Sequence, residues 1–190
     1  NWNISINKLH KSKDSKDNSA KSFRRLVFDE LCANFFTLSE SRKRIKKDKL
    51  PKKFLKEKSI FIKKKLPFNL TKSQEIVLKE INRDLFSKKR MFRIIQGDVG
   101  SGKTIVSLLA ISNVIESGYQ CALMGPTEIL AKQHFELAKK IFRGTSFEID
   151  YLTGKTENKK RKKILENLES GKTDLIIGTH SLFQKKINFK

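Results

Sequence analysis

Apolar residues along the chain follow two different periods, and these predict an alternation of strands and helices after residue 66. Short continuous apolar runs cover residues 92–96, 120–125, 147–152 and 174–178. Apolar positions three or four residues apart, the helical period, fill the segments that start near residues 105, 128 and 157. This alternation is typical of a parallel sheet with crossover helices. We therefore expect an α/β fold over residues 66–190.

The first third of the chain has a different pattern. Residues 1–21 are mostly Lys, Ser, Asp and Asn after the first few positions, which predicts a disordered or extended linker. From Ser22 apolar residues recur at helical steps, and they predict a helix of several turns. Residues 42–65 are rich in Lys and Arg with apolar residues between them. We expect residues 22–65 to form a helical and basic connector, either solvated or in contact with a nucleic-acid backbone.

A further helix is predicted to begin after Thr71, because apolar residues recur from there to Leu85. Thr71 and Gln74 have the spacing of a capping box, in which each side chain accepts a hydrogen bond from a backbone N–H at the helix start. A glutamine amide is also suited to recognise adenine, because it both donates and accepts hydrogen bonds. The two roles do not exclude each other, and both remain open for Gln74.

The segment that follows the apolar run at 92–96 fits the phosphate-loop pattern G-x-x-x-x-G-K-[ST] at every fixed position. Its residues are Gly97, Asp98, Val99, Gly100, Ser101, Gly102, Lys103 and Thr104. Glycines let backbone N–H groups surround phosphate oxygens, Lys103 can reach the β and γ phosphates, and the Thr104 hydroxyl can ligate Mg²⁺. A simple helix start after a Gly-rich turn is the alternative. The flanking strand and helix favour a site for ATP or GTP.

Short polar groups follow the other three predicted strands. They are Pro126-Thr127-Glu128, Thr153-Gly154-Lys155 and Thr179-His180-Ser181. Ligands of open α/β sheets lie outside the carboxyl ends of the strands, so these groups are expected to share one edge with the phosphate loop. Hydroxyls, exposed backbone N–H groups and helix N-termini suit phosphate contacts. Each group taken singly also fits a structural role as a helix cap, a turn or a surface residue.

The composition favours a polyanionic partner. Lys and Arg number 42 against 20 Asp and Glu, which gives a net charge of +22. General overuse of lysine is the alternative. The two cysteines, Cys32 and Cys121, have no spacing typical of a disulfide framework or a zinc site. The sequence contains neither a membrane-length apolar run nor the apolar core of a signal peptide, so we expect a soluble cytoplasmic protein without membrane contact.

Four stretches together resemble one known family, the RecG helicases, which are bacterial ATP-dependent branch-migration enzymes of superfamily 2. The stretches are residues 96–104, 122–134, 152–154 and 177–180. The resemblance is close from residue 66 onward and extends back to about residue 20. The transcription-repair coupling factor shares much of this pattern, but it typically has an aromatic residue in place of Ser101 and Thr in place of Glu128. Both positions favour RecG.

The resemblance implies a role for each matching residue. Gln74 would read adenine, and Phe68 would stack on the base. Lys103 and Thr104 would bind the triphosphate of ATP and Mg²⁺. Three groups would hold the backbone of one DNA strand without reading its sequence. These groups are Pro126, Thr127 and Glu128, then Thr153 and Gly154, and then Gly178, Thr179 and His180.

The family pattern continues beyond both ends of this sequence. Its acidic Asp-Glu-x-His motif and second motor domain would follow Lys190, and its DNA-binding wedge domain would precede Asn1. We therefore expect residues 66–190 to be part of a P-loop, RecA-like domain that does not hydrolyse ATP alone. The whole protein is expected to be a monomeric ATP-dependent helicase that remodels stalled forks and Holliday junctions in DNA repair and recombination. A coupling-factor type translocase, or a basic nucleic-acid-binding module with a vestigial nucleotide site, is the alternative.

Overall fold

The computed structural model describes residues 2–11, 16–45, 57–183 and 187–190. The chain divides into two compact units, Asn1–Lys49 and Leu50–Lys190. The sequence predicts a connector that extends to residue 65, but helix α3 (Glu57–Lys65) belongs to the second unit. Ile62 of α3 is 1% exposed and lies in the same apolar core as the later helices. α3 also packs against α5, so we describe this helix with the second unit.

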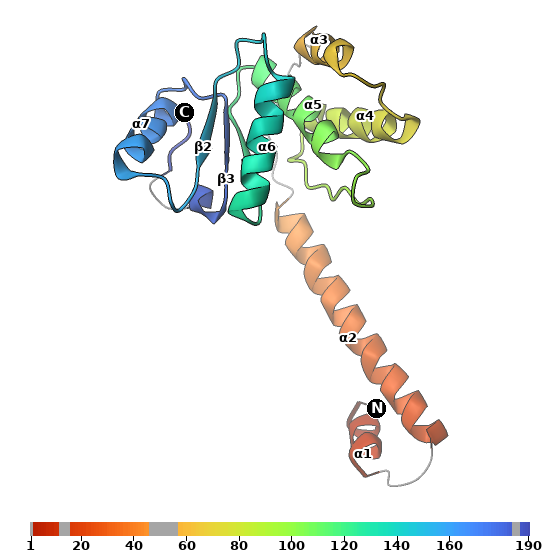
Figure 1. The fold of residues 1–190 in the computed structure, drawn as a ribbon. Helices are drawn as coiled ribbons and strands as arrows, with labels where there is room; N and C mark the ends of the chain where they lie inside the picture. Colours follow the sequence, from red (N-terminus) through yellow and green to blue (C-terminus); the bar gives the residue numbers. More distant parts are fainter. Residues whose placement is uncertain (1, 12–15, 46–56, 184–186) are drawn as a thin grey trace. The chain divides into compact units, whose positions relative to one another are not determined.

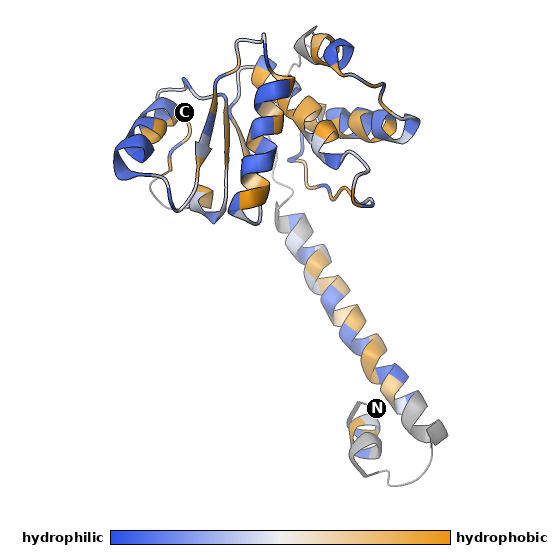
Figure 2. Cartoon of the chain, in the orientation of Figure 1, coloured by the Kyte–Doolittle hydropathy of each residue, from blue (hydrophilic) through white to orange (hydrophobic). Residues whose placement is uncertain are grey.

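The first unit consists of helix α1 (Trp2–Lys11) packed against helix α2 (Lys16–Ile45) (Figure 1). The prediction of a disordered or extended linker over residues 1–21 differs from these helices. Residues 1 and 12–15 of the predicted linker lie outside the described residues. The sequence does contain a helical signal here, because Trp2, Ile6 and Leu9 stand four and three positions apart. The helix predicted from Ser22 onward is present and longer than expected, and apolar and polar residues alternate along it (Figure 2). Several of its apolar side chains, among them Phe23, Leu31 and Phe35, are exposed.

The second unit contains a parallel sheet of three strands in the order β1-β3-β2. The strands are β1 (Cys121–Met124), β2 (Ile149–Leu152) and β3 (Leu175–Gly178). Met124 and Leu152 each pair with Gly178, so all three strands end at the same level. The central strand β3 is buried along its whole length, as expected for a strand covered on both faces. The predicted α/β fold with a parallel sheet is confirmed.

Helices cover both faces of the sheet (Figure 1). Leu175 and Ile177 of β3 face a core that is built with α3, α4 (Lys72–Phe86), α5 (Lys103–Glu116) and α6 (Glu128–Ile141). Ile176 faces the other way, toward α7 (Asn158–Glu169) and the short 3₁₀ helix η1 (His180–Phe183). Successive residues of a strand point to opposite faces, which explains the division into two cores. None of the described helices combines the length and apolar character that a membrane span requires.

The apolar run at residues 92–96 is extended but is not a strand. Phe92 and Ile94 are exposed, whereas Ile95 packs against the larger core. A strand is defined by a hydrogen-bonded neighbour, and none of the three described strands pairs with this run. The prediction of a core strand immediately before the phosphate loop is therefore wrong for the described residues. The alternating exposure nevertheless keeps the pattern of a strand with one covered face.

Candidate functional site

The phosphate loop, residues 97–102, joins this extended segment to the N-terminus of α5. Gly100 and Gly102 have φ angles of 83° and 81°, in the left-handed region that is unfavourable for residues with a Cβ. A Cβ at Gly102 would also overlap the side-chain amide nitrogen of Gln74. Gly102 is the N-cap of α5 and provides no side chain that could cap the helix. The first backbone N–H groups of α5 therefore remain directed toward the loop, as in anion sites at helix N-termini.

Lys103 is folded into the loop that it follows. Its Nζ donates hydrogen bonds to the carbonyl oxygens of Gly97, at 2.7 Å, and Asp98, at 2.6 Å. These carbonyls hold the ammonium group beside the place where the glycines would surround a phosphate. The Thr104 hydroxyl makes no hydrogen bond within the part of the chain that the structure describes. A cation, a hydroxyl and the N-terminus of a helix thus converge, and this donor set fits a nucleotide triphosphate with Mg²⁺.

Gln74 connects helix α4 to the phosphate loop. Its Oε1 accepts a hydrogen bond from the Thr71 N–H at 2.9 Å, and its own N–H donates to Thr71 Oγ1 at 3.3 Å. The capping box predicted from the sequence is therefore confirmed. Gln74 Nε2 donates to the carbonyl oxygen of Ser101 at 2.9 Å. Between α4 and the loop lies a cavity of about 390 Å³ that is lined by Gln74 and Lys103 among others.

Phe68 does not line this cavity. It lines a neighbouring one of about 470 Å³, together with Ile105 at the start of α5 and Arg143 after the end of α6. The Phe68 side chain is 47% exposed. The structure thus brings Gln74 and Lys103 together and leaves Phe68 on a separate apolar surface. Sequence reasoning missed Arg143, because nothing in the local pattern shows that the end of α6 approaches Phe68.

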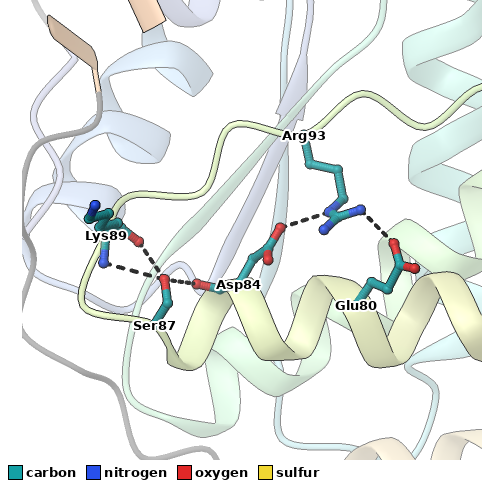
Figure 3. Close-up of polar contacts among 5 residues, drawn as sticks. All are labelled: Glu80, Asp84, Ser87, Lys89 and Arg93. Atoms are coloured by element: carbon teal, nitrogen blue, oxygen red, sulfur yellow. Dashed lines mark hydrogen bonds and ion pairs between the residues drawn. The ribbon is translucent and has the colours of Figure 1, made fainter. Parts of the chain in front are cut away.

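Arg93 fastens the extended segment before the loop to α4 (Figure 3). Its Nε donates to Asp84 Oδ2 at 2.7 Å and its Nη1 donates to Glu80 Oε2 at 2.6 Å. The hydrogen bond to Asp84 is the largest cause that raises the pKa of Arg93 above its ordinary value. Ser87 Oγ donates to the carbonyl oxygens of Asp84 and Lys89, which closes the turn after α4. Sequence reasoning missed Arg93, although two carboxylates four residues apart on α4 were a usable signal.

The three polar groups after the strands lie at one edge of the sheet, as predicted, because the strands are parallel and end in register. Hydrogen bonds link the group at residues 178–181 to the ends of both neighbouring strands. The Gly125 N–H donates to the Gly178 carbonyl oxygen at 2.8 Å, and Ser181 Oγ donates to the Leu152 carbonyl oxygen at 3.1 Å. We call these three groups, residues 126–128, 153–155 and 178–181, the strand tips.

Several of the predicted contact residues in the strand tips have clear structural roles. Thr127 is the N-cap of α6, where its Oγ1 accepts a hydrogen bond from the Leu130 N–H at 3.2 Å. Thr153 is 5% exposed, and its N–H donates to Thr156 Oγ1. A Cβ at Gly178 would overlap the carbonyl oxygen of Leu152. Other residues face solvent in whole or in part, and these are Pro126, Gly154, Thr179 and His180.

Glu128 forms an ion pair rather than standing as a free carboxylate. Its Oε2 lies 3.0 Å from Nζ of Lys155, which connects the tip after β1 with the tip after β2. The hydrogen bond with Glu128 is the largest cause that raises the pKa of Lys155. Tyr151 Oη donates to the Glu128 carbonyl oxygen at 3.2 Å, and burial is the main reason why the pKa of Tyr151 is raised. Lys155 is therefore an exposed cation at this edge; the sequence places it in the polar group after β2, although the resemblance to the family implied a DNA contact only for Thr153 and Gly154.

No cluster of three His, Cys, Asp or Glu side chains suited to a metal ion occurs among the described residues. Within this part of the chain, a Mg²⁺ site would thus depend on Thr104 and on oxygen atoms of the nucleotide itself. The parallel sheet, the phosphate loop and the helix that starts at Lys103 together define a P-loop nucleotide-binding domain.

The particular family follows from sequence comparison. The sequence profile of the DEAD/DEAH box helicase family matches residues 71–190, and the chain belongs to this family. Its relatives include proteins named ATP-dependent DNA helicase RecG. The Aquifex aeolicus protein is 40% identical over 98% of this chain and 24% of its own length. The Bacillus subtilis protein is 41% identical over 88% of this chain and 25% of its own length.

Solved structures agree with the sequence relatives. A structure described as RecG bound to a three-way DNA junction has a TM-score of 0.78 and 37% identity over 93% of this chain and 24% of that chain. A hypothetical ATP-dependent RNA helicase from Sulfolobus tokodaii has a TM-score of 0.54 and 19% identity over 70% of this chain and 38% of that chain, which shows the fold alone. The chain spans about a quarter of the length of the RecG relatives that it matches. The resemblance to RecG is confirmed.

Proposed function

We propose that this chain is the nucleotide-binding part of an ATP-dependent helicase that remodels branched DNA. One observation carries the proposal: the segment that ends in Lys103 is a formed phosphate loop, and the domain around it presents three strand tips at one edge of a parallel sheet. A motor on DNA needs a nucleotide site and a grip on the DNA backbone within one domain. The RecG relatives and the structure with a three-way junction support branched DNA as the substrate.

In this proposal the phosphate loop and Lys103 bind the β and γ phosphates of ATP. Lys103 would exchange its hydrogen bonds with the carbonyls of Gly97 and Asp98 for contacts with phosphate oxygens. The Thr104 hydroxyl would be a ligand of Mg²⁺, which neutralises charge on the phosphates when it is bound. Gln74 would recognise adenine only after one of its present hydrogen bonds, to Thr71 or to Ser101, is given up.

Adenine recognition is proposed for two residues, Gln74 and Phe68, and variants can test them separately. The cavity lined by Gln74 and the cavity lined by Phe68 share no lining residue, although both include residues of α5. If Phe68 stacks on adenine, Phe68→Ala weakens binding of ATP about tenfold, because base–aromatic stacking contributes about 1–3 kcal/mol. Competition between ATP and GTP for the purified protein measures whether Gln74→Ala lowers the preference for adenine. Unchanged ATP affinity in Phe68→Ala would remove that residue from the site.

The grip on DNA is proposed for the exposed members of the strand tips. Backbone N–H groups, the Thr179 hydroxyl and the Lys155 ammonium suit phosphate oxygens, which are the same for every sequence. Glu128 would act indirectly by holding Lys155 in place, since a carboxylate repels a phosphate. Thr127, Thr153 and Gly178 would shape the edge through the contacts already described. We further propose that the whole protein is a monomer that acts on chromosomal DNA in the cytoplasm.

Hydrolysis of ATP by the full-length gene product tests this function. We expect a three-way DNA junction to stimulate hydrolysis more than a linear duplex does, and Lys103→Ala to abolish hydrolysis with either DNA. Lys79→Ala is the matched control, because Lys79 is an exposed lysine of α4 outside the loop. DNA binding without any effect of nucleotide would instead identify a basic binding module with a vestigial site. Equal hydrolysis by the Lys103→Ala variant would refute the proposal.

A further inference from the structure

Helix α7 has a charge pattern opposite to the one that stabilises a helix. Five basic residues, Lys159, Lys160, Arg161, Lys162 and Lys163, fill its first half, and Glu166 and Glu169 lie in its second half. Cations near a helix N-terminus oppose the macrodipole, and like charges three or four residues apart repel each other. The N-cap Glu157 adds no side-chain hydrogen bond. The five clustered cations therefore lower the stability of α7 as a helix.

Packing holds α7 in place despite this cost. Ile164 and Leu168 are buried against Leu152 and Ile176, on the sheet face opposite to α5 and α6. Lys159, Lys160 and Lys163 are exposed, and within the described residues they form no hydrogen bond or ion pair. Lys162 has one partner, Glu166, at 4.0 Å. The fully exposed residues of α7 are thus all polar or charged, and three of its five basic side chains have no such partner within the described residues.

The basic half of α7 begins at the edge of the sheet where the strand tips lie. β2 ends at Leu152, the tip at residues 153–155 follows, and α7 starts at Asn158. Lys155, whose side chain is 85% exposed, is the last residue of this tip. Basic residues thus continue along the chain from this strand tip into the first half of α7, which covers one face of the sheet. Positive charge on this path attracts a polyanion that already contacts the strand tips.

The exposed side of α7 distinguishes between two kinds of nucleic acid. Its exposed residues are Asn, Lys and Glu, and none is aromatic. Single strands are generally bound by aromatic side chains on which the bases stack, together with basic grooves. Duplex DNA presents only phosphates and groove edges, and lysine contacts its phosphates without sequence preference. A lysine surface without aromatic residues therefore fits the backbone of a duplex.

We propose that Lys159, Lys160 and Lys163 of α7 form a docking surface for the phosphate backbone of duplex DNA that extends beyond the strand tips. This inference rests on the proposed function, because it assumes that DNA reaches the strand tips. It adds a second contact area on the opposite face of the sheet from α4. It also explains why the basic residues stand at the end of α7 where they weaken the helix.

The test uses a variant of the full-length gene product with Lys159→Gln, Lys160→Gln and Lys163→Gln. Its affinity for a linear duplex is measured over a series of salt concentrations. The loss of three phosphate contacts makes the negative slope of log K against log salt shallower by about 2.7. It also weakens binding on the order of a hundredfold near ~0.1 M salt. The control carries Lys79→Gln, Lys88→Gln and Lys89→Gln, three exposed lysines in or shortly after α4. It is expected to retain the slope of the wild type.

Thermal unfolding provides a second measurement, and its expected result differs from the one that a purely structural role of these lysines would give. Removal of repulsion at the N-terminal half of α7 is expected to raise the Tm of the α7 variant while DNA binding falls. An unchanged salt slope, an equal loss in the control variant, or a loss for single strands alone would overturn the docking surface. Failure of the proposed function is seen separately, because it would leave ATP hydrolysis unaffected by Lys103→Ala.

Discussion

The phosphate loop and the strand tips make their polar contacts in opposite ways. Lys103 bonds to carbonyls of its own loop, and Gln74 bonds to the loop from α4. In the tip at residues 178–181, Ser181 instead donates to the Leu152 carbonyl oxygen of one neighbouring strand, and the Gly178 carbonyl oxygen accepts from the Gly125 N–H after the other. Contacts within a loop can be exchanged for a ligand without disturbing the sheet, whereas contacts between strands are part of the sheet. Substitutions in the loop should therefore act on the ligand, and many substitutions in the strand tips should act on the fold.

The largest effect is expected from Gly178→Ala. Its Cβ would overlap the Leu152 carbonyl oxygen, so β2 and β3 must separate, and overpacking of this kind lowers the free energy of unfolding by about 3 kcal/mol. Gly154→Ala is the matched control in another strand tip, where a Cβ meets nothing within 4 Å. Urea denaturation of both variants measures the difference. Equal stability of the two variants would contradict the close approach of β2 and β3 at Gly178.

A smaller effect on stability, and a larger one on the nucleotide, is expected from Gly102→Ala. The left-handed φ costs about 1–2 kcal/mol for a residue with a Cβ, and the added methyl group would displace the Gln74 amide. Gly100→Ala has the same backbone strain but nothing near its Cβ. Comparing ATP binding by the two variants isolates the contact with Gln74. Identical affinities would mean that Gln74 need not be next to Gly102 for ATP to bind.

Arg93→Gln tests whether support from α4 matters to the loop. Partly exposed ion pairs contribute modestly, so we expect ATP binding to weaken about two- to fivefold. Asp84→Asn alone and combined with Arg93→Gln completes a double-mutant cycle. The combined variant should bind ATP no more weakly than Arg93→Gln alone if Arg93 and Asp84 act through their ion pair. Additive losses would assign the effect of Arg93 to some other contact.

The smallest effect is a dependence of stability on alkaline pH at the strand tips. The pKa values of Tyr151 and Lys155 are both raised in the folded chain, Tyr151 mainly by burial and Lys155 mainly by its hydrogen bond to Glu128. A raised pKa favours the protonated form in the folded state, so this stabilisation is complete below the unfolded pKa and is lost as the pH rises through the folded value. Urea denaturation from about pH 8 to pH 11 should show a decline above about pH 10 that is smaller in Tyr151→Phe. An identical decline in both proteins would contradict the contribution of Tyr151.

Local patterns were sufficient to predict much of this domain. The phosphate loop and the capping box of Thr71 and Gln74 depend on residues at most seven positions apart, so the sequence displays them directly. Parallel strands with polar tips follow from the alternation of two hydrophobic periods. The shared edge of the strand tips then follows from parallel pairing alone.

Contacts between distant segments could not be predicted in this way. Phe68 lines one cavity together with the end of α6, and Arg93 reaches carboxylates of α4, because the tertiary fold brings these segments together. The run at 92–96 has the composition of a strand, but a strand also needs a neighbour to pair with. Composition was equally misleading for residues 2–11, where a few correctly spaced apolar residues accompany a helix.

Binding of a fluorescent ATP analogue in the presence of Mg²⁺ tests most directly whether residues 97–104 hold a nucleotide. Lys103→Ala removes the ammonium group that lies among the loop carbonyls, and loss of a charged hydrogen-bonding group is expected to weaken binding about tenfold to a hundredfold. Lys155→Ala, which alters a cation at the strand tips, is expected to bind the analogue as the wild type does. Equal affinity in the wild type and Lys103→Ala would contradict a nucleotide site in the phosphate loop.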